Sequence, residues 1–412
     1  MDTIASVSAK RIGFNSLWLL TARVLTQALA LIFTATAARR LGVAAFGQFS
    51  VMAALIFLGN TVTTFGTDTL LIRETARAGG LTPLAPTALY LQLALSVLWI
   101  GGVIGVSVIF PAALPESRPA LFIYLLSLFP LAFYTVFSAI LRAFERMELF
   151  LALNLLTSLL QTAGAVVLIR TQNDLLILCA WLSLTQGVAA VLGGGLCSRL
   201  GAFSTLWPPA RLADIWRVML AAWPLAALTA VALFSQRLSL LLLLPLVGDD
   251  GEAAGWFSAA ARLVDGLKIG HYAVLGALLP ALSRRSSLET KRLFLTSGAA
   301  MLALSVLLAL GLTWLADPIV TLVYGSHFTP AAQALRVLAW SLIPYTFNAY
   351  LSLDFIAQGK ERKILRATLF GLAISAGMYA LLIPRIGAIG AGWGMLTGEG
   401  VVAATLLWLS RK

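Results

Sequence analysis

Long, mainly apolar runs recur along the whole of this 412-residue sequence and leave few folds open to it. A helix needs about 20 such residues to cross the hydrocarbon core of a bilayer. Hydrophobic residues make up 60% of the chain and charged residues only 11%, whereas soluble domains carry about 25% charged residues. These proportions exclude a cytosolic enzyme, a secreted disulfide scaffold and a disordered protein. The sequence therefore predicts an integral membrane protein.

Twelve runs of this kind predict an all-α fold of about twelve transmembrane helices. A membrane β-barrel is excluded because its strands alternate apolar and polar residues over about ten positions. The first run is longer than the apolar core of a signal peptide, which spans about 7–15 residues, so we assign it as a helix. The predicted spans are residues 13–37, 44–65, 85–110, 119–140, 148–168, 175–197, 218–245, 254–281, 293–315, 333–355, 364–384 and 387–410.

Lysine and arginine residues are distributed unevenly between the two sets of loops. If the amino terminus is cytoplasmic, 18 of the 29 basic residues fall in cytoplasmic segments, 5 fall on the opposite side and the others lie within or beside spans. Cytoplasmic loops of membrane proteins carry an excess of basic residues. We therefore predict that both termini are cytoplasmic. The net charge of +12 reflects this topology, and we expect no nucleic-acid partner.

A short motif occurs twice, each time after the first predicted span of one half of the chain. Residues 47–50 read G-Q-F-S and residues 255–258 read G-W-F-S, an offset of 208 residues. Both copies have the same predicted membrane orientation, so the repeat is parallel, an arrangement that transporters use to form a substrate site between two halves. We predict two six-helix lobes, residues 1–200 and 218–412, joined by a cytoplasmic linker at residues 201–217.

Charged residues fall inside several predicted spans, although a charge at a helix centre costs about 2.5–3.5 kcal/mol on insertion scales. In the first span, Asn15, Arg23 and Gln27 are spaced by eight and four residues and share one helical face. Intramembrane cations often mark a substrate pathway, which favours a cavity-lining role for Arg23. The structural alternative is an arginine bonded to neighbouring carbonyl groups.

The seventh and eighth spans carry the densest charge. Arg237 lies in the seventh, while Arg262, Asp265, Lys268 and His271 lie in the eighth. Asp265 can pair at a spacing of three with either Arg262 or Lys268, so internal neutralisation is the structural alternative. One positive charge remains after either pairing. Together with the arginines of the first and seventh spans, it predicts an inward cationic cluster that suits a phosphate-bearing substrate.

Glu399 lies between two glycines in the twelfth span and is a candidate proton carrier or a partner for an arginine across the bundle. The two histidines, His271 and His327, have no partner at metal-ligand spacing, nor do Cys179 and Cys197. Walker A, H-E-x-x-H and G-x-S-x-G motifs are all absent from the sequence. We therefore expect no metal site, no cofactor and no enzymatic activity.

Further motifs extend over most of the chain: N-S-L-W at residues 15–18, A-R-R-L-G at 38–42, G-W-F-S-A-A at 255–260 and P-R-I-G-A-I-G-A at 384–391. Together they resemble the polysaccharide transporter family, the Wzx-type flippases of O-antigen, capsule and exopolysaccharide repeat units. This family belongs to the multidrug/oligosaccharidyl-lipid/polysaccharide exporter superfamily. The resemblance implies two six-helix lobes around a central cavity that work by alternating access.

The resemblance also implies a substrate, an undecaprenyl-diphosphate-linked oligosaccharide that is moved across the bacterial inner membrane for surface polysaccharide synthesis. Membrane lipids, a polysaccharide polymerase and glycosyltransferases are the implied partners. On this basis we assign Arg23, Arg237 and Lys268, with Asn15 and Gln27, to the diphosphate. Arg262, Asp265 and His271 would shape the field around it, and Glu399 would carry a coupling proton.

Ser239 departs from the family pattern, because many relatives place an aspartate two positions after the arginine of the seventh helix. The chain also lacks two further C-terminal helices that are expected of lipid II flippases. The main alternative is a cation-coupled exporter of drugs or of another lipid in the same superfamily. A site for cationic drugs should be acidic and aromatic, however, and the deep charges here are mostly basic. A polymerase or ligase would need a substantial outer loop, and every predicted outer loop is short.

Overall fold

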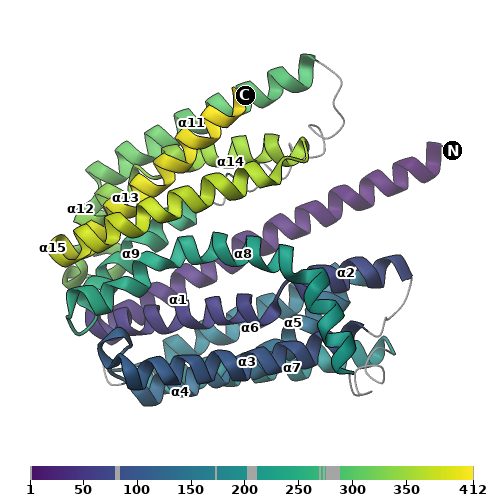
Figure 1. Ribbon diagram of the computed structural model, residues 1–412, viewed down its shortest axis with the longest axis horizontal. Coiled ribbons are helices and arrows are strands. Elements are labelled where there is room, and N and C mark those ends of the chain that lie inside the picture. Colours follow the sequence, from purple (N-terminus) through teal and green to yellow (C-terminus); the bar gives the residue numbers. More distant parts are fainter. Residues whose placement is uncertain are drawn as a thin grey trace. The chain divides into compact units, whose positions relative to one another are not determined.

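The computed structural model describes residues 2–78, 84–171, 174–201, 211–268, 271, 274 and 288–411. Side chains are described from residue 25 onward, except at 113, 212, 224, 225, 228 and 288–291. Over these ranges the chain forms helices and no β-strand (Figure 1). This confirms the prediction of an all-α membrane protein.

The helices keep the numbering of Figure 1, and two short 3₁₀ turns are called η1 and η4. They are α1 (Asp2–Thr64), α2 (Thr67–Ala78), α3 (Leu84–Ile109), η1 (Pro111–Ala113), α4 (Arg118–Leu126), α5 (Leu128–Ala143), α6 (Met147–Leu168), α7 (Leu175–Arg199), α8 (Leu212–Val247), α9 (Glu252–Leu267), α11 (Leu288–Trp314), α12 (Ala316–Tyr324), η4 (Ser326–Phe328), α13 (Ala331–Ala339), α14 (Leu342–Ala357) and α15 (Glu361–Ser410).

Eight helical segments in the described part of the chain are long and apolar enough to cross a membrane. Two of them contain two predicted spans each, because α1 is broken at Gly42 (φ 77°) and α15 at Ile386 and Gly387 (φ 51° at the glycine). The eighth predicted span is described only to Lys268 and at His271 and Val274. The total of twelve spans therefore stays a prediction.

The fourth and tenth predicted spans each consist of two helices that meet at a serine. Ser127 separates α4 from α5, and Ser341 precedes α14. Each hydroxyl group donates to the carbonyl three residues earlier, over 2.6 Å. A proline follows three positions later in both cases, and its ring cannot tolerate a continuous helix over the preceding turn. The sequences S-L-F-P (127–130) and S-L-I-P (341–344) thus repeat a helix break.

The chain divides into two compact units, which are described separately. Unit 1 comprises residues 1–37, 55–109 and 117–230, and unit 2 comprises 38–54, 110–116 and 231–412. α1 and α8 each contribute to both. The lobes predicted from the repeat, with their boundary at residues 201–217, stay a prediction.

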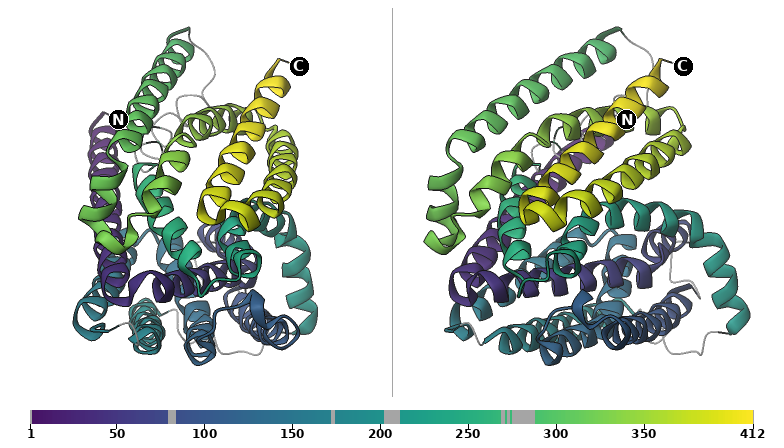
Figure 2. Two further views of the ribbon diagram at one scale, coloured as in Figure 1. Left: turned by 90° about the vertical axis from the view of Figure 1, so that its left-hand side faces the viewer. Right: turned by 60° about the vertical axis from the view of Figure 1, so that its left-hand side comes forward.

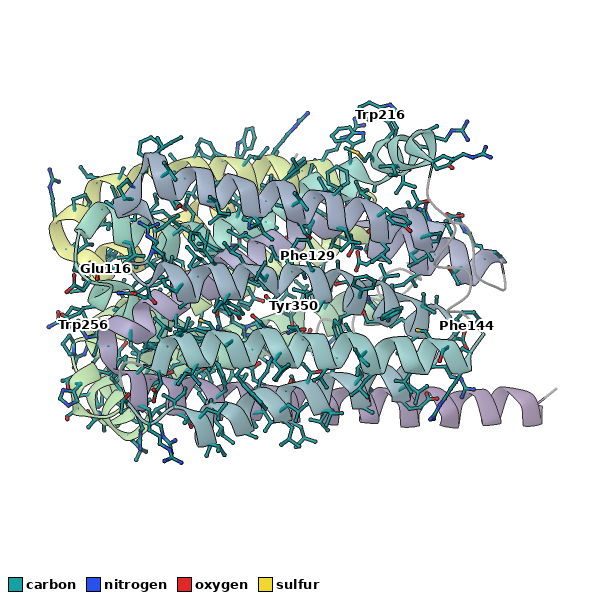
Figure 3. The ribbon with its side chains drawn as sticks, turned by 90° about the horizontal axis from the view of Figure 1, so that it is seen from below. Glu116, Phe129, Phe144, Trp216, Trp256 and Tyr350 are labelled. Carbon is teal, nitrogen blue, oxygen red and sulfur yellow. The ribbon has the colours of Figure 1, made fainter. Side chains whose placement is uncertain are left out.

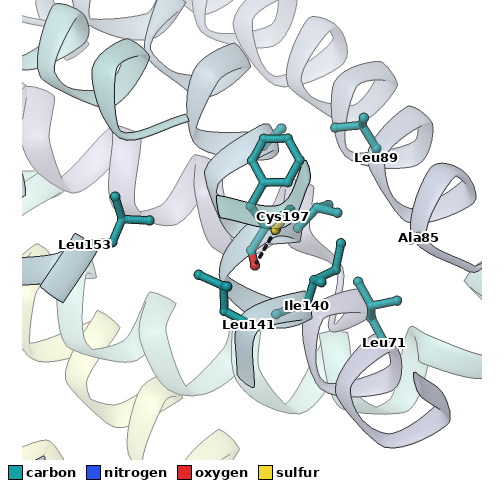
Figure 4. Packing of buried hydrophobic residues seen from close by; sticks show 11 residues of the cluster. Leu71, Ala85, Leu89, Ile140, Leu141, Leu153 and Cys197 are labelled. Atoms are coloured by element: carbon teal, nitrogen blue, oxygen red, sulfur yellow. Dashed lines mark hydrogen bonds between the residues drawn. The ribbon is translucent and has the colours of Figure 1, made fainter. Parts of the chain in front are cut away.

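Unit 1 is built around α5 and α7, with α2, α3 and α6 packed against them. Its core contains Leu71, Leu89, Ile140, Leu153 and Cys197 (Figure 4). The Cys197 thiol donates to the carbonyl of Phe137 over 3.7 Å. Both cysteines are buried, and neither forms a disulfide. Because lipid tails are as apolar as these side chains, close packing and hydrogen bonds hold such helices together.

In unit 2 the two arms of α15 fold back on each other at the break, as Figure 2 shows. Small residues let the arms approach: a Cβ atom on Gly398 would overlap Ser375, and one on Gly394 would overlap the Tyr379 ring. Gly390, Gly394 and Gly398 lie four residues apart on one arm, the spacing of the G-x-x-x-G helix contact. Close backbone contact therefore fixes the second arm, which carries Glu399.

The two copies of the repeated motif contact each other within unit 2. A Cβ atom on Gly47 would overlap the carbonyl oxygen of Gly251, and one on Gly255 would overlap the carbonyl oxygen of Val43. Val43 and Gly251 are themselves separated by the motif offset of 208 residues, so the two contacts are reciprocal. In an interface with two-fold symmetry, each contact between two residues occurs a second time between their equivalents. The motif copies therefore pack backbone to backbone across a local two-fold relation.

Candidate functional site

The site is built on α9, whose first turn is fixed by Asp249. The Asp249 carboxylate accepts hydrogen bonds from the backbone N–H groups of Gly251 (3.1 Å) and Ala253 (2.7 Å). Gly251 has a φ of 108°, a conformation that favours glycine. Gln48 adds a bond from its amide to the carbonyl of Asp250 over 3.0 Å. These contacts tie the start of α9 to the second half of α1.

Lys268 ends α9 and is almost completely buried, with 8% of its surface exposed. Its Nζ atom lies 2.9 Å from Oδ1 of Asp265 and 4.9 Å from the centroid of the Tyr345 ring. Of the two partners that the sequence allows for Asp265, the structure thus places Lys268 in contact. The ammonium group is held between a carboxylate and the negative face of an aromatic ring.

Glu399 lies near this ion pair. Asn348 of α14 donates from Nδ2 to Oε2 of Glu399 (2.6 Å) and to its backbone carbonyl (3.0 Å). The charges of Lys268 and Asp265 both act on the Glu399 carboxyl group. The predicted proton carrier and the predicted phosphate ligand therefore belong to one electrostatic cluster.

Arg237 joins the same cluster from α8. Its guanidinium group is influenced by the like charge of Arg262 and the opposite charge of Asp265. Electrostatic interactions thus connect three cations, Arg237, Arg262 and Lys268, with the carboxyl groups of Asp265 and Glu399. When both carboxylates are ionised one positive charge remains, and protonation of Glu399 leaves two. We call these five residues the unit 2 charge cluster.

His271 lies beside the cluster and is 1% exposed. Its Nε2 atom is 2.8 Å from Oγ1 of Thr346 and 3.2 Å from Oγ of Ser305, and these two hydroxyl groups are 2.8 Å apart. Its ring also packs edge-on against Tyr345, with centroids 5.4 Å apart. Among the described residues no group of three potential metal ligands exists. His271 therefore connects α11 and α14 through hydrogen bonds.

The first-span residues are less fully described. Asn15 and Arg23 lie in α1, and their side chains fall outside the described part of the structure. Gln27 is partly buried in the portion of α1 that belongs to unit 1. Their assignment to the diphosphate stays a prediction.

Sequence reasoning missed Tyr345 and Asn348. Tyr345 contacts both Lys268 and His271, while Asn348 holds Glu399. The sequence does contain a feature that could have predicted these contacts. Three polar residues, Tyr345, Thr346 and Asn348, lie within four positions of the tenth predicted span. Polar side chains at membrane depth often hydrogen-bond across helices.

Both the sequence and the fold of this chain are similar to those of known proteins. The family model described as "Polysaccharide biosynthesis protein" matches residues 12–286, more than half of the chain. The chain belongs to the polysaccharide biosynthesis protein family. A second model, "Lipid II flippase MurJ", matches residues 266–412, a range that contains Lys268 and Glu399. No curated protein matches this chain.

Solved structures share the fold of this family member. A multidrug resistance MATE transporter of the MOP superfamily in an inward-facing conformation has a TM-score of 0.76 and 16% identity, covering 93% of this chain and 94% of its own. Lipid II flippase MurJ in an inward closed conformation has a TM-score of 0.76 and 13% identity, covering 96% and 87%. A MOP superfamily transporter from Pyrococcus furiosus has a TM-score of 0.64 and 16% identity, covering 96% and 95%.

These matches show a multi-pass membrane protein of the polysaccharide biosynthesis protein family, with the fold of MOP superfamily transporters. The second family model is named for a flippase, and the solved structures described above are transporters and a flippase.

Proposed function

We propose that this protein moves an undecaprenyl-diphosphate-linked oligosaccharide across the bacterial inner membrane by alternating access, for the synthesis of a surface polysaccharide. The unit 2 charge cluster supports the proposal most directly. It holds three cations against two carboxyl groups on helices of a flippase family. An excess of positive charge beside membrane-spanning segments suits an anionic headgroup and disfavours a cationic drug.

In this proposal Lys268 and Arg237 bind the diphosphate. An ammonium group has three donors, and Asp265 occupies one direction around Nζ of Lys268 while the Tyr345 ring covers another. The remaining donor can reach a phosphate oxygen. Arg237 adds a planar guanidinium group, which can bind two phosphate oxygens at once. Arg262 and Asp265 set the field in which the two ligands act, and His271 fixes Tyr345. Arg23, with Asn15 and Gln27, stays assigned to the diphosphate as the sequence of the first span predicts.

Glu399 and Asn348 form the proposed proton-coupling element. An ionised Glu399 only accepts hydrogen bonds, which matches the donation that it receives from Nδ2 of Asn348. Oδ1 of Asn348 is buried and accepts no hydrogen bond from the described residues. A protonated Glu399 could donate to this oxygen after the amide rotates. Proton binding would therefore reverse the Asn348–Glu399 hydrogen bond and raise the positive charge offered to the diphosphate.

Deletion of the gene in its native host tests the proposal. Surface polysaccharide and extracted undecaprenyl-diphosphate glycans are measured together. We expect loss of the surface polymer with accumulation of complete lipid-linked repeat units, restored by the wild-type gene but not by Lys268→Glu at equal protein level. Normal polymer and normal lipid-linked pools in the deletion strain would refute the proposal. The polymerase and glycosyltransferases that act on the same polymer are the proposed partners.

A lipid II-type substrate is the second candidate. The MurJ model matches residues 266–412, which include Lys268, Asn348 and Glu399. The two substrates share a polyprenyl diphosphate and differ in the attached sugar. Rescue of a strain depleted of its lipid II flippase would favour this candidate, whereas accumulation of surface-polymer precursors in the deletion strain would favour the first.

A further inference from the structure

Unit 1 contains an apolar cavity that the unit 2 charge cluster does not involve. Its volume is about 720 Å³, and it opens to the surface between α3, α5 and α7. This volume lies within the range of about 300–1,000 Å³ that is usual for small-molecule sites. Its walls include Leu89, Tyr90 and Leu93 of α3, and Phe129, Phe133 and Phe137 of α5. No charged side chain of the described residues lines it.

The third wall is a run of small residues on α7. Gly187 and Gly195 both line the cavity, and an added Cβ atom at either position would meet no atom within 4 Å. The α7 backbone is therefore open to the cavity at these two positions. Aromatic rings face it across the space, with Phe133 and Phe137 6.3 Å apart between centroids. A bulky, branched hydrocarbon chain fits such a wide apolar space better than it fits a narrow groove between helices.

The cavity extends over about half the thickness of a bilayer. On α7 it reaches from Gly187 to Ser198, one residue before the helix ends at Arg199. At 1.5 Å per residue this is roughly 17 Å, against about 15 Å for one leaflet of a 30 Å core. Figure 3 places Phe129 midway along the helices and Phe144, which follows α5, toward one end of them. In the predicted topology this end is cytoplasmic.

Basic residues stand at that end of the cavity. Arg142 lies in the last turn of α5 and Arg199 in the last turn of α7. Arg142 is 3.8 Å from Asp68 and lies over the Phe150 ring, so its charge is already engaged. Arg199 is exposed and adjoins Ser198, which lines the cavity. An uncharged apolar cavity that ends beside an exposed arginine is complementary to a lipid with an anionic headgroup.

We infer that this cavity holds the polyprenyl chain of the lipid-linked substrate in the cytoplasmic leaflet, with the diphosphate beside Arg199. The inference rests on the proposed function and names the surface that receives the lipid part of the same substrate. It places the first contact of the substrate in unit 1, at the leaflet in which lipid-linked units are assembled. The charge cluster would then act on the headgroup at a later step.

Gly195→Phe tests the inference because Gly195 lines the cavity and an added Cβ atom at this position would meet nothing within 4 Å. Gly102→Phe on α3 is the matched control: its Cβ atom would also meet nothing within 4 Å, and Gly102 does not line the cavity. The purified full-length protein in nanodiscs is labelled with a benzophenone-bearing undecaprenyl diphosphate that carries no sugar. Labelled peptides are then mapped by mass spectrometry.

For the wild-type protein we expect labelling of α5 and α7 that excess undecaprenyl diphosphate removes and the same concentration of phosphatidylglycerol does not. Gly195→Phe should lower this labelling at least tenfold, and Gly102→Phe should leave it unchanged. Equal competition by phosphatidylglycerol, or full labelling of Gly195→Phe, would overturn the inference. The probe has no sugar, so its labelling does not depend on which glycan is transported. Intact labelling together with normal surface polymer and normal lipid-linked pools in the deletion strain would therefore count against the proposed function alone.

Discussion

The contact between the two motif copies makes a stability prediction that is independent of transport. Gly47→Ala adds one methyl group where the carbonyl oxygen of Gly251 already lies, and the amide nitrogen of Gly255 would be 2.6 Å from that methyl carbon. Both neighbours are backbone atoms, so no side chain can rotate away. One of the two helices must shift to accommodate the methyl group.

The size of the effect follows from two opposing terms. Forcing an extra carbon into a well-packed contact costs about 1–3 kcal/mol, and occasionally more. Replacing glycine by alanine inside a helix stabilises the helix by up to about 1 kcal/mol, because alanine has the higher helix propensity. We expect Gly47→Ala to lower the free energy of unfolding by about 1–2 kcal/mol. Gly101→Ala, whose methyl group would enter open space, should leave it unchanged or raise it by up to about 1 kcal/mol.

Equilibrium unfolding of the purified protein in detergent micelles measures both variants under identical conditions. The double variant Gly47→Ala with Gly255→Ala sharpens the test, because the two methyl groups would enter one shared contact. Its cost should differ from the sum of the single costs by at least about 0.5 kcal/mol, as expected for residues in contact. The reasoning is refuted if Gly47→Ala unfolds with the same free energy as Gly101→Ala.

Three further predictions concern single side chains. Lys268→Met should abolish transport at normal protein level, whereas Lys268→Arg, which keeps the positive charge, should retain part of it. Comparable activity of the two variants in the flippase assay would show that transport does not require a positive charge at this position. Asp249→Ala should lower stability by about 0.5–2 kcal/mol, since two N–H groups at the start of α9 lose their acceptor, and a melting curve unchanged from wild type would contradict this. Backbone hydrogen bonds from Arg170 and Thr171 lower the pKa of Asp174, which lies just before α7. The two backbone amides should therefore be protected from hydrogen exchange at any pH above the ordinary pKa of an aspartate. They should lose this protection as the pH falls through the lowered pKa of Asp174. Hydrogen exchange of the two amides measures the effect, which Asp174→Asn should remove.

Part of the site could be predicted from residue spacing alone. A spacing of three residues on one helix allows Asp265 to pair with Lys268 or with Arg262, and the high cost of charge in hydrocarbon marks Lys268 and Glu399 as special positions. The partners of these residues could not be predicted in the same way. Tyr345 and Asn348 reach the cluster from another helix, and only tertiary packing decides which polar residue of one helix faces which charge of another.

The two helix breaks occur at a sequence pattern that hydropathy alone does not identify. S-x-x-P occurs at residues 127–130 and again at 341–344, and both copies interrupt a helix. Hydropathy joins the two sides of each break into one span, because neither the serine nor the proline is charged. The proline ring acts on the preceding turn through sterics, which a count of apolar residues does not register.

The structure adds a packing role to the repeated glycine motif. A residue that lies at a two-fold axis packs against its own equivalent, so a small residue required in one copy is required in the other as well. Gly47 meets Gly251 and Gly255 meets Val43, and each contact leaves no room for a Cβ atom. Both copies of the repeat are therefore under the same packing constraint. The charged residues, in contrast, differ between the two halves. The residue of the first half that is equivalent to Lys268, 208 positions earlier, is the uncharged Asn60, so only the second half carries this cation. In this chain the shared residues hold the fold together, and the residues that break the repeat form the candidate site.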